Sequence, residues 1–263
     1  MKHFHHLQLA LAGAAIASAC ASACLSGCTN AEAYTAPDAP IKEVPFTQVH
    51  FTDSFWAPRI ETNRTVSIPS AFRECEKNGR FDNFAIAGGL KKGEHRGDFS
   101  FDDTDPYKVI EGASYSLAVK YDPQLDAYLD SVIGLIAAAQ EPDGYLTTCV
   151  TNKCTRLSGW WGTHRWEKLN SHELYNSGHM YEAAVAHHLA TGKRNFLDVA
   201  LKNADLVCEV FGPGEKQKHV PSGHPIVEMA LAKLYKLTGN EKYLNTAKYF
   251  VCLLYTSDAA DEL

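Results

Sequence analysis

The stretch HHLATGKRNFLDVA at residues 187–200 and the stretch LYKLTGNEKYLNTA at residues 234–247 share one pattern. In each, an apolar helical pattern runs into a Thr-Gly pair, and a second apolar pattern follows. Glycine readily takes the left-handed conformation just past the C-terminus of a helix. Each stretch therefore predicts a helix, a stop at Gly192 or Gly239, and a second helix.

The same helix-pair pattern extends outward from these stretches. Residues 180–190 and 226–237 predict the first helix of each pair, and residues 125–136 resemble 196–207 as a fainter third copy. Repeated helix pairs stack and bury a shared core, either as an open superhelix or as a closed toroid. The long irregular segment at 141–170 favours the toroid, because enzymes with a toroid fold carry long site-forming loops at one end. The expected fold class is all-α, an incomplete (α/α)6 toroid with a short extended N-terminal arm.

The sequence before the repeats predicts further helices at 58–78 and 123–140. Asp103-Thr104-Asp105-Pro106 is a helix start signal, with an acidic cap and a proline in the first turn. From Val44 to Trp56 apolar and polar residues roughly alternate. This alternation predicts a short strand or an extended arm packed on the domain.

Composition and charge exclude several classes of protein. The 263 residues are 45% hydrophobic and 11% aromatic, as in ordinary globular proteins. Lys and Arg total 25 against 31 Asp and Glu, a net charge of −6, and no basic stripe is visible. We therefore expect no nucleic-acid partner.

Residues 1–27 predict a lipoprotein signal peptide, with Lys2 ahead of an apolar stretch too short for a membrane span. Leu25-Ser26-Gly27-Cys28 resembles the bacterial lipobox, in which the cysteine is lipidated. We expect Cys28 to anchor an exported protein in a membrane, in the periplasm or outer membrane of a Gram-negative bacterium. An ordinary cleaved signal is the alternative. Residues 28–44, with Thr, Ala, Pro and Asp and little apolar pattern, predict a tether.

The last residues stand apart from the repeat pattern. Residues 252–263, which begin Cys-Leu-Leu-Tyr-Thr-Ser, resemble the conceptual translation of a transposon-based sequencing adaptor. A polar helix end that matches by chance is the alternative. On the first interpretation the catalytic-domain segment is 45–251.

The densest polar cluster is SHELYNSGH at residues 171–179. His172, Tyr175 and His179 share a helix face at this spacing. His224 stands at the matching start of the next repeat's first helix, and such starts point into the cavity of a toroid. Because a neutral imidazole exchanges hydrogen bonds with sugar hydroxyls, we predict that His172 and His224 bind substrate. Capping or core packing is the alternative for both, and packing is the prediction for His179.

Aromatic residues mark the long segment at 141–170. Tyr145, Trp160 and Trp161 offer flat faces on which sugar C–H groups can stack. We predict them as substrate-binding residues; the alternative is that they roof the core.

Cysteines and acids give weaker signals. Cys149 and Cys154 are close enough in sequence for a disulfide in an exported protein. A metal ion bound by these two cysteines would need a third and a fourth ligand, and the neighbouring sequence offers none. We therefore predict no metal ligand. Asp103 and Asp105 form a pair that could seem like glycosidase carboxylates, but capping accounts for Asp105.

Four motifs in this order and spacing resemble glycoside hydrolase family 127, which includes β-L-arabinofuranosidases. They are FDDTDPYK at 101–108, QEPDGYL at 140–146, SHELY at 171–175, and GHP at 223–225, which leads into ALAKLY at 230–235. The resemblance covers the N-terminal part of the family's catalytic domain.

The resemblance implies an (α/α)6 toroid followed by β-sandwich domains. It implies retaining exo-hydrolysis of terminal β-L-arabinofuranosyl residues from arabinose-containing oligosaccharides or plant glycans. His172 and His224 fall on family positions that contact the sugar. The family's nucleophile is a zinc-bound cysteine and its acid/base is a glutamate; both, with the zinc ligands, lie beyond Val251. We therefore expect no catalytic residue and no zinc ligand in this chain, and an inactive fragment.

Two other functions remain open from the sequence. One is an unsaturated uronyl hydrolase-like toroid enzyme, in which Asp103 or Asp105 would be catalytic. The other is a non-catalytic glycan-binding surface lipoprotein that uses the tryptophan-rich segment.

Overall fold

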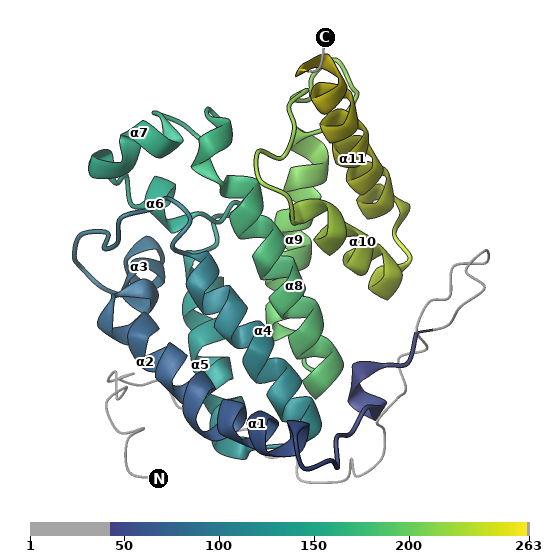
Figure 1. The fold of residues 1–263 in the computed structure, drawn as a ribbon. Coiled ribbons are helices and arrows are strands. Elements are labelled where there is room, and N and C mark those ends of the chain that lie inside the picture. The colour runs from purple at the N-terminus through teal and green to yellow at the C-terminus, as the bar shows by residue number, and fades with distance from the viewer. Residues whose placement is uncertain (1–42, 262–263) are drawn as a thin grey trace, which may run out of the picture. The chain divides into compact units, whose positions relative to one another are not determined.

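The computed structural model describes residues 43–261, with side chains described as far as residue 253. The predicted signal peptide, Cys28 and nearly all of the tether lie outside the described residues. The described part is helical, which confirms the all-α prediction (Figure 1). Its α-helices are α1 (Trp56–Thr62), α2 (Ile68–Lys77), α3 (Arg80–Ala87), α4 (Thr104–Val119), α5 (Pro123–Ala139), α6 (Thr148–Thr151), α7 (Ser158–Trp161), α8 (Glu173–Thr191), α9 (Asn195–Val210), α10 (Val227–Thr238) and α11 (Glu241–Asp261).

The long helices form two rows. In the first row, α2 contacts α4, α4 packs along α8, and α8 packs against α10. In the second row, α3 contacts α5, α5 contacts α9, and α9 contacts α11. Each first-row helix is followed in the chain by a second-row helix. This alternation is the arrangement of an (α/α) toroid fragment, as the repeat pattern predicted.

Short turns join the helices of a pair. Gly192 and Gly239 have φ values of 73° and 70°, in the left-handed region, as predicted from the Thr-Gly pattern. Asp122 caps α5, because its carboxylate accepts hydrogen bonds from the backbone N–H of Gln124 at 2.9 Å and Leu125 at 3.3 Å. These local signals fix where the helices stop and start.

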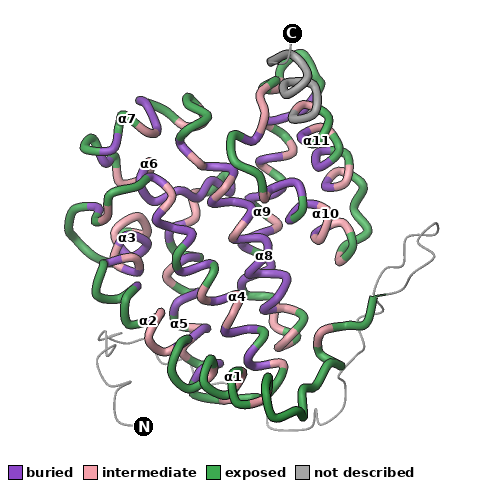
Figure 2. The backbone as a smooth tube through the Cα atoms, in the orientation of Figure 1, coloured by how far each residue is buried: buried purple, intermediate pink, exposed green. Residues whose placement is uncertain are grey.

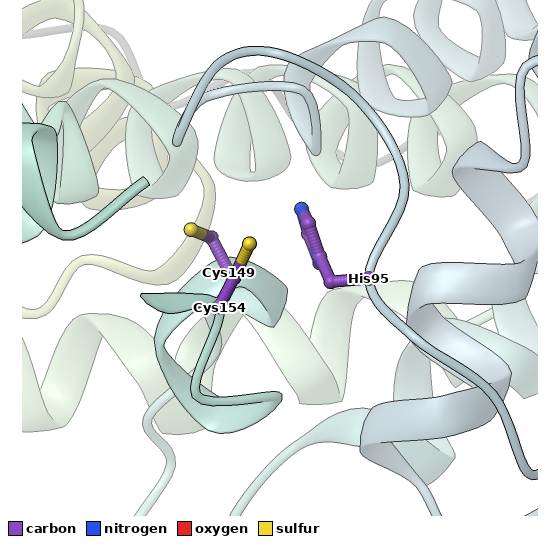
Figure 3. Close-up of side chains that lie close together, drawn as sticks. All are labelled: His95, Cys149 and Cys154. Carbon is purple, nitrogen blue, oxygen red and sulfur yellow. The ribbon is translucent and has the colours of Figure 1, made fainter. Parts of the chain in front are cut away.

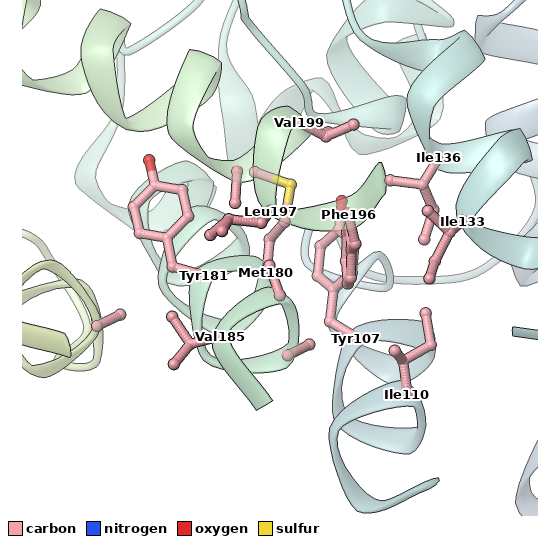
Figure 4. Packing of buried hydrophobic residues seen from close by; sticks show 14 of the residues in the cluster. Tyr107, Ile110, Ile133, Ile136, Met180, Tyr181, Val185, Phe196, Leu197 and Val199 are labelled. Atoms are coloured by element: carbon pink, nitrogen blue, oxygen red, sulfur yellow. The ribbon is translucent and has the colours of Figure 1, made fainter. Parts of the chain in front are cut away.

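The core lies between the two rows, where buried residues follow the facing sides of the helices (Figure 2). Tyr107 of α4 packs against Phe196 of α9, with ring centroids 6.2 Å apart. Ile136 of α5 and Met180 of α8 are fully buried in the same cluster (Figure 4). Burial of these apolar surfaces is the main stabilising contribution to the stack.

The N-terminal arm differs from the strand that the alternation suggested. Residues Phe46–Gln48 form one 3-10 turn, and the described residues form no strand there. Val49 and Phe51 are exposed, so the alternation reflects no buried face. The alternative, an arm packed on the domain, is confirmed at Phe46, whose ring lies 4.9 Å from that of Tyr115.

The helix predicted at 58–78 is interrupted. A π-helical stretch at Asn63–Ser67 separates α1 from α2. Pro69 stands in the first turn of α2 and has no N–H to donate. The regular α-helical hydrogen-bond pattern therefore cannot run unbroken through this point.

None of the described helices combines the length and the apolar character that crossing a membrane requires.

Candidate functional site

The chain segments that lead into α4, α8 and α10 bring three side-chain rings together, those of Phe101, His172 and His224. His172 directly precedes α8, and His224 lies just before α10. Their imidazole centroids are 5.7 Å apart, and the ring of Phe101, which precedes α4, lies 4.6 Å from that of His172. The structure thus brings the two predicted sugar-binding histidines side by side, at the ends of stacked helices.

Tyr175 lies at the centre of this group. Its ring is 4.7 Å from His224 and 4.5 Å from His179, which confirms that the three residues predicted on one face of α8 share it. Lys108 of α4 donates a hydrogen bond to the Tyr175 hydroxyl at 2.8 Å. An ammonium group therefore stands beside the rings.

Trp160 of α7 completes one wall. Its ring lies 6.3 Å from His172 and 6.1 Å from Phe101, both edge-on. Below, the name histidine–aromatic cluster means Phe101, Lys108, Trp160, His172, Tyr175, His179 and His224. It combines polar ring nitrogens with apolar ring faces, which is the chemistry that recognises a sugar.

Tyr145 and Trp161 lie away from this cluster. Tyr145 is fully buried; the Arg165 guanidinium lies over its ring at 4.0 Å, and its hydroxyl donates to Glu173. Trp161 is 6% exposed and donates from Nε1 to the Cys154 carbonyl at 3.0 Å. Tyr145 presents no open face to a sugar, so the roof interpretation fits it. Trp161 is largely buried but lines a pocket with Thr163 and Arg165.

The backbone holds both histidine segments in unusual conformations. His172 has φ 58° and Ile226, next to α10, has φ 153°, both at positions that L-residues rarely adopt. The Nδ1 atom of His172 is 2.6 Å from the Asn170 carbonyl, and that of His224 is 3.1 Å from the Pro225 carbonyl. Because a carbonyl oxygen only accepts, these contacts put the ring proton on Nδ1. In the neutral ring, Nε2 is then the nitrogen that accepts a hydrogen bond.

Buried hydrogen bonds to Glu173 hold the start of α8, next to His172 of the histidine–aromatic cluster. Glu173 accepts hydrogen bonds from the Tyr145 hydroxyl, the Ser171 hydroxyl at 2.7 Å and the Trp166 N–H at 2.9 Å. Burial raises the pKa of Glu173 above its usual value, although these donors oppose that shift. The network ties the 141–170 segment to the start of α8.

The two acids at the start of α4 are not caps. Asp103 accepts from the Thr148 N–H at 2.7 Å and from its hydroxyl at 2.5 Å, and no side-chain cap bond forms. Asp105 accepts from the Arg80 Nε at 2.9 Å. The capping prediction is wrong because both carboxylates turn toward other segments. Burial raises the pKa of Asp103 to about 7, and its oxygens are occupied by Thr148.

The sequence reasoning did not single out Phe101, Lys108 or His95. Phe101 could have been found by its position, because it precedes a first-row helix as His172 and His224 do. Lys108 lies one turn into the same helix. His95 carries no local signal, since the residues around it form no helix or strand.

Among the described cysteines, Cys75, Cys149, Cys154 and Cys208 are free thiols. The disulfide that the sequence allows between Cys149 and Cys154 is not formed in this structure. The sequence showed no third ligand for this pair, but the fold supplies one: His95 lies beside them. Cys75 is buried in the core, and burial raises the pKa of its thiol to about 12.

Comparison with known proteins gives a consistent result. Residues 48–257 match the family model described as beta-L-arabinofuranosidase, GH127 catalytic domain. A non-reducing end beta-L-arabinofuranosidase of Bifidobacterium longum subsp. longum is 44% identical over 171 residues, which are 64% of this chain and 25% of that protein.

Two solved structures are similar over the same region. A GH127 beta-arabinofuranosidase has 53% identity and a TM-score of 0.75, over 79% of this chain and 33% of that one. A GH127 beta-L-arabinofuranosidase from Geobacillus stearothermophilus T6 has 41% identity and a TM-score of 0.73, over 78% and 32%. The chain thus spans about a quarter to a third of the length of these relatives.

Proposed function

Because this chain belongs to the GH127 β-L-arabinofuranosidase catalytic-domain family, whose members are glycoside hydrolases that act on glycans, we propose that its histidine–aromatic cluster binds a terminal β-L-arabinofuranosyl residue. The observation that carries the proposal is the meeting of His172 and His224, 5.7 Å apart at the starts of adjacent first-row segments. The identity of the sugar follows from the names of the relatives.

The described side chains divide the work of recognition. His172 and His224 accept hydrogen bonds from sugar hydroxyls through Nε2, because Nδ1 of each ring faces a carbonyl oxygen. Phe101 and Trp160 pack against sugar C–H groups and exclude water from that side. Lys108 holds the Tyr175 hydroxyl in place between the histidines.

Bond cleavage is proposed to use groups that this cluster does not contain. The contacts of the His172 and His224 rings are to other rings and to backbone oxygens. Among the described thiols, Cys75 is in the core and Cys208 lies against the Lys242 carbonyl. As the resemblance to the family implies, the thiolate nucleophile, its zinc ligands and the glutamate acid/base are proposed to lie outside residues 45–251. When bound, zinc would keep the nucleophile as a thiolate.

Export and anchoring are part of the same proposal. A hydrolase of extracellular glycans is expected outside the cytoplasm, which agrees with the lipobox-like stretch before Cys28. Mass spectrometry of a membrane extract tests the anchor: a lipid on Cys28 supports it, and an unmodified Cys28 contradicts it. Sequencing of the locus past Val251 tests whether residues 252–263 belong to the gene.

Binding of methyl β-L-arabinofuranoside by this chain, followed by NMR titration, tests the proposed site. His172→Ala and His224→Ala should each weaken binding about fivefold, since each removes a hydrogen bond worth about 1 kcal/mol. His164→Ala is the matched control, because this exposed imidazole lies against Thr163 and Glu167 rather than against the cluster. Unchanged affinity in both cluster variants would refute the site. Turnover of an aryl β-L-arabinofuranoside by this chain would refute the placement of the reacting groups.

A further inference from the structure

Three side chains with metal-binding atoms meet away from the contacts of the histidine–aromatic cluster. The ligand atoms of His95, Cys149 and Cys154 all lie within 4.8 Å of one another (Figure 3). All three are buried, with 9%, 1% and 9% of their surfaces exposed. Two sulfurs and one imidazole form a soft donor set of the kind that zinc prefers.

The imidazole of His95 has an atom without a partner. Its Nε2 is buried and makes no hydrogen bond, while Nδ1 lies 3.4 Å from the side-chain amide of Asn152. Figure 3 shows the ring beside the two sulfur atoms. A neutral imidazole is the form that binds metals.

The two cysteines are held in a compact turn. The Cys154 N–H donates to the Cys149 carbonyl at 3.0 Å, so α6 and the residues after it present both sulfurs to one side. Burial and the neighbouring Cys154 raise the pKa of the Cys149 thiol above its usual value. A bound cation would favour the thiolate form of a cysteine ligand.

We propose that His95 Nε2 and the sulfurs of Cys149 and Cys154 bind one zinc ion, with water as the fourth ligand. Binding converts both thiols to thiolates and releases their two protons to solvent. Zinc–sulfur bonds of about 2.3 Å and a zinc–nitrogen bond of about 2.0 Å set ligand atoms about 3.5 Å apart. The site therefore needs a small closing movement, and the ring proton moves to Nδ1. The proposed function places the catalytic zinc outside residues 45–251, so this site would be separate from it.

The ion would join the two segments that form one wall of the cluster. His95 lies on the segment from α3 to α4, which continues to Phe101. Cys149 and Cys154 begin the segment that carries Trp160, and Cys154 packs with Leu157 in a small core of its own. The two segments already meet where Arg156 pairs with Asp98 at 3.1 Å. Zinc would cross-link them, and this binding does not depend on the proposed function.

A second group with metal-binding atoms shows the contrast. Asp126, Asp130 and His187 also lie close together. There the Lys193 ammonium is 2.6 Å from Asp126 and 2.7 Å from Asp130. The charged side chain of Lys193 thus already lies where a metal ion would bind these two carboxylates. In the described part of the chain, no lysine ammonium is paired in this way with the donors at His95.

Zinc binding to the reduced, chelator-treated chain tests the proposal. After dialysis against zinc, elemental analysis should find one zinc per wild-type chain. The double variant Cys149→Ser, Cys154→Ser should retain less than about a tenth of this, because it removes both sulfur ligands. Cys208→Ser, which removes a half-buried thiol elsewhere, is the matched control and should retain all of it. Equal retention by the double variant would overturn the proposal.

X-ray absorption spectroscopy of the zinc-loaded wild-type chain tests the zinc ligands directly. This measurement does not depend on whether the double variant folds. The expected first shell contains two sulfurs at about 2.3 Å with nitrogen and oxygen ligands at about 2.0 Å. A shell of nitrogen and oxygen alone would overturn the site. So would a wild-type chain that retains no zinc, or an intact mass showing a Cys149–Cys154 disulfide after exposure to zinc.

Discussion

The imidazole rings of His172 and His224 lie 5.7 Å apart, although the whole of α8 and α9 separates them in the chain. Their meeting depends on how closely α8 and α10 stack. Gly178 of α8 lies close to the start of α10, because a Cβ at this position would come within 3.0 Å of Ile226 and Val227. The geometry of the site is therefore a consequence of helix packing.

Gly178→Ala should destabilise the fold. A Cβ at this position would lie 2.5 Å from Cγ2 of Ile226 and 2.7 Å from the backbone N of Val227, so the start of α10 would have to move. We expect a loss of about 1–3 kcal/mol in the free energy of unfolding, measured with urea. Gly134→Ala in α5 is the matched control, since nothing lies within 4 Å of its Cβ position. It should gain about 0.5–1 kcal/mol; equal effects of the two variants would contradict close stacking at Gly178.

Trp160→Ala and Tyr145→Phe should separate the two predicted aromatic roles. Trp160 faces His172, so its removal should weaken binding of methyl β-L-arabinofuranoside about five- to tenfold with little loss of stability. Tyr145→Phe removes the hydroxyl that donates to buried Glu173. It should cost about 1–2 kcal/mol of stability and leave affinity unchanged. NMR titration measures the affinity for the sugar, and urea unfolding measures the stability. Weaker binding by Tyr145→Phe would show that Tyr145 contributes to the sugar site.

Asp103→Asn should change the pH dependence of stability. The folded-state pKa of Asp103 is raised from 3.8 to about 7 by burial. A raised pKa means that the folded state binds the proton more tightly. The stabilising contribution is therefore full below about pH 4 and is lost as pH rises through about 7. The shift corresponds to at most about 4 kcal/mol.

The amide that Asp103→Asn introduces has no such titration. The variant should gain stability relative to wild type between about pH 4.5 and about pH 8, as followed by urea unfolding. Asp98→Asn is the control, because that carboxylate is 86% exposed. A difference between Asp103→Asn and wild type that does not change with pH would contradict the raised pKa.

Lys233→Met should be more harmful than the loss of a surface ion pair. Lys233 of α10 pairs with Glu182 of α8, which is only 3% exposed and has one oxygen without a partner. Removal of the lysine leaves a buried carboxylate unpaired and should cost about 3 kcal/mol. In the double variant with Glu182→Gln, about half of this loss should return. Additive losses in thermal unfolding would show that the pair contributes nothing to α8–α10 stacking.

Much of the fold followed from local signals. The Thr-Gly stops and the helix at 123–140 were readable because their signals act within one or two turns of helix. The strand expected in the arm was wrong because alternation is informative only where a partner strand and a buried face exist. The cap expected at Asp105 was wrong because its carboxylate pairs with Arg80, which is distant in sequence.

The sequence alone determined the helix pairs, the family and the two histidines, since these depend on residue type and short-range spacing. The tertiary structure decided which side chains share a site. Phe101 and Trp160 lie beside His172, whereas Tyr145 and Trp161 are buried. His95 lies close to Cys149 and Cys154. The physical reason is that these neighbours come from different segments, and only the stacking of the helix rows sets the distances between them.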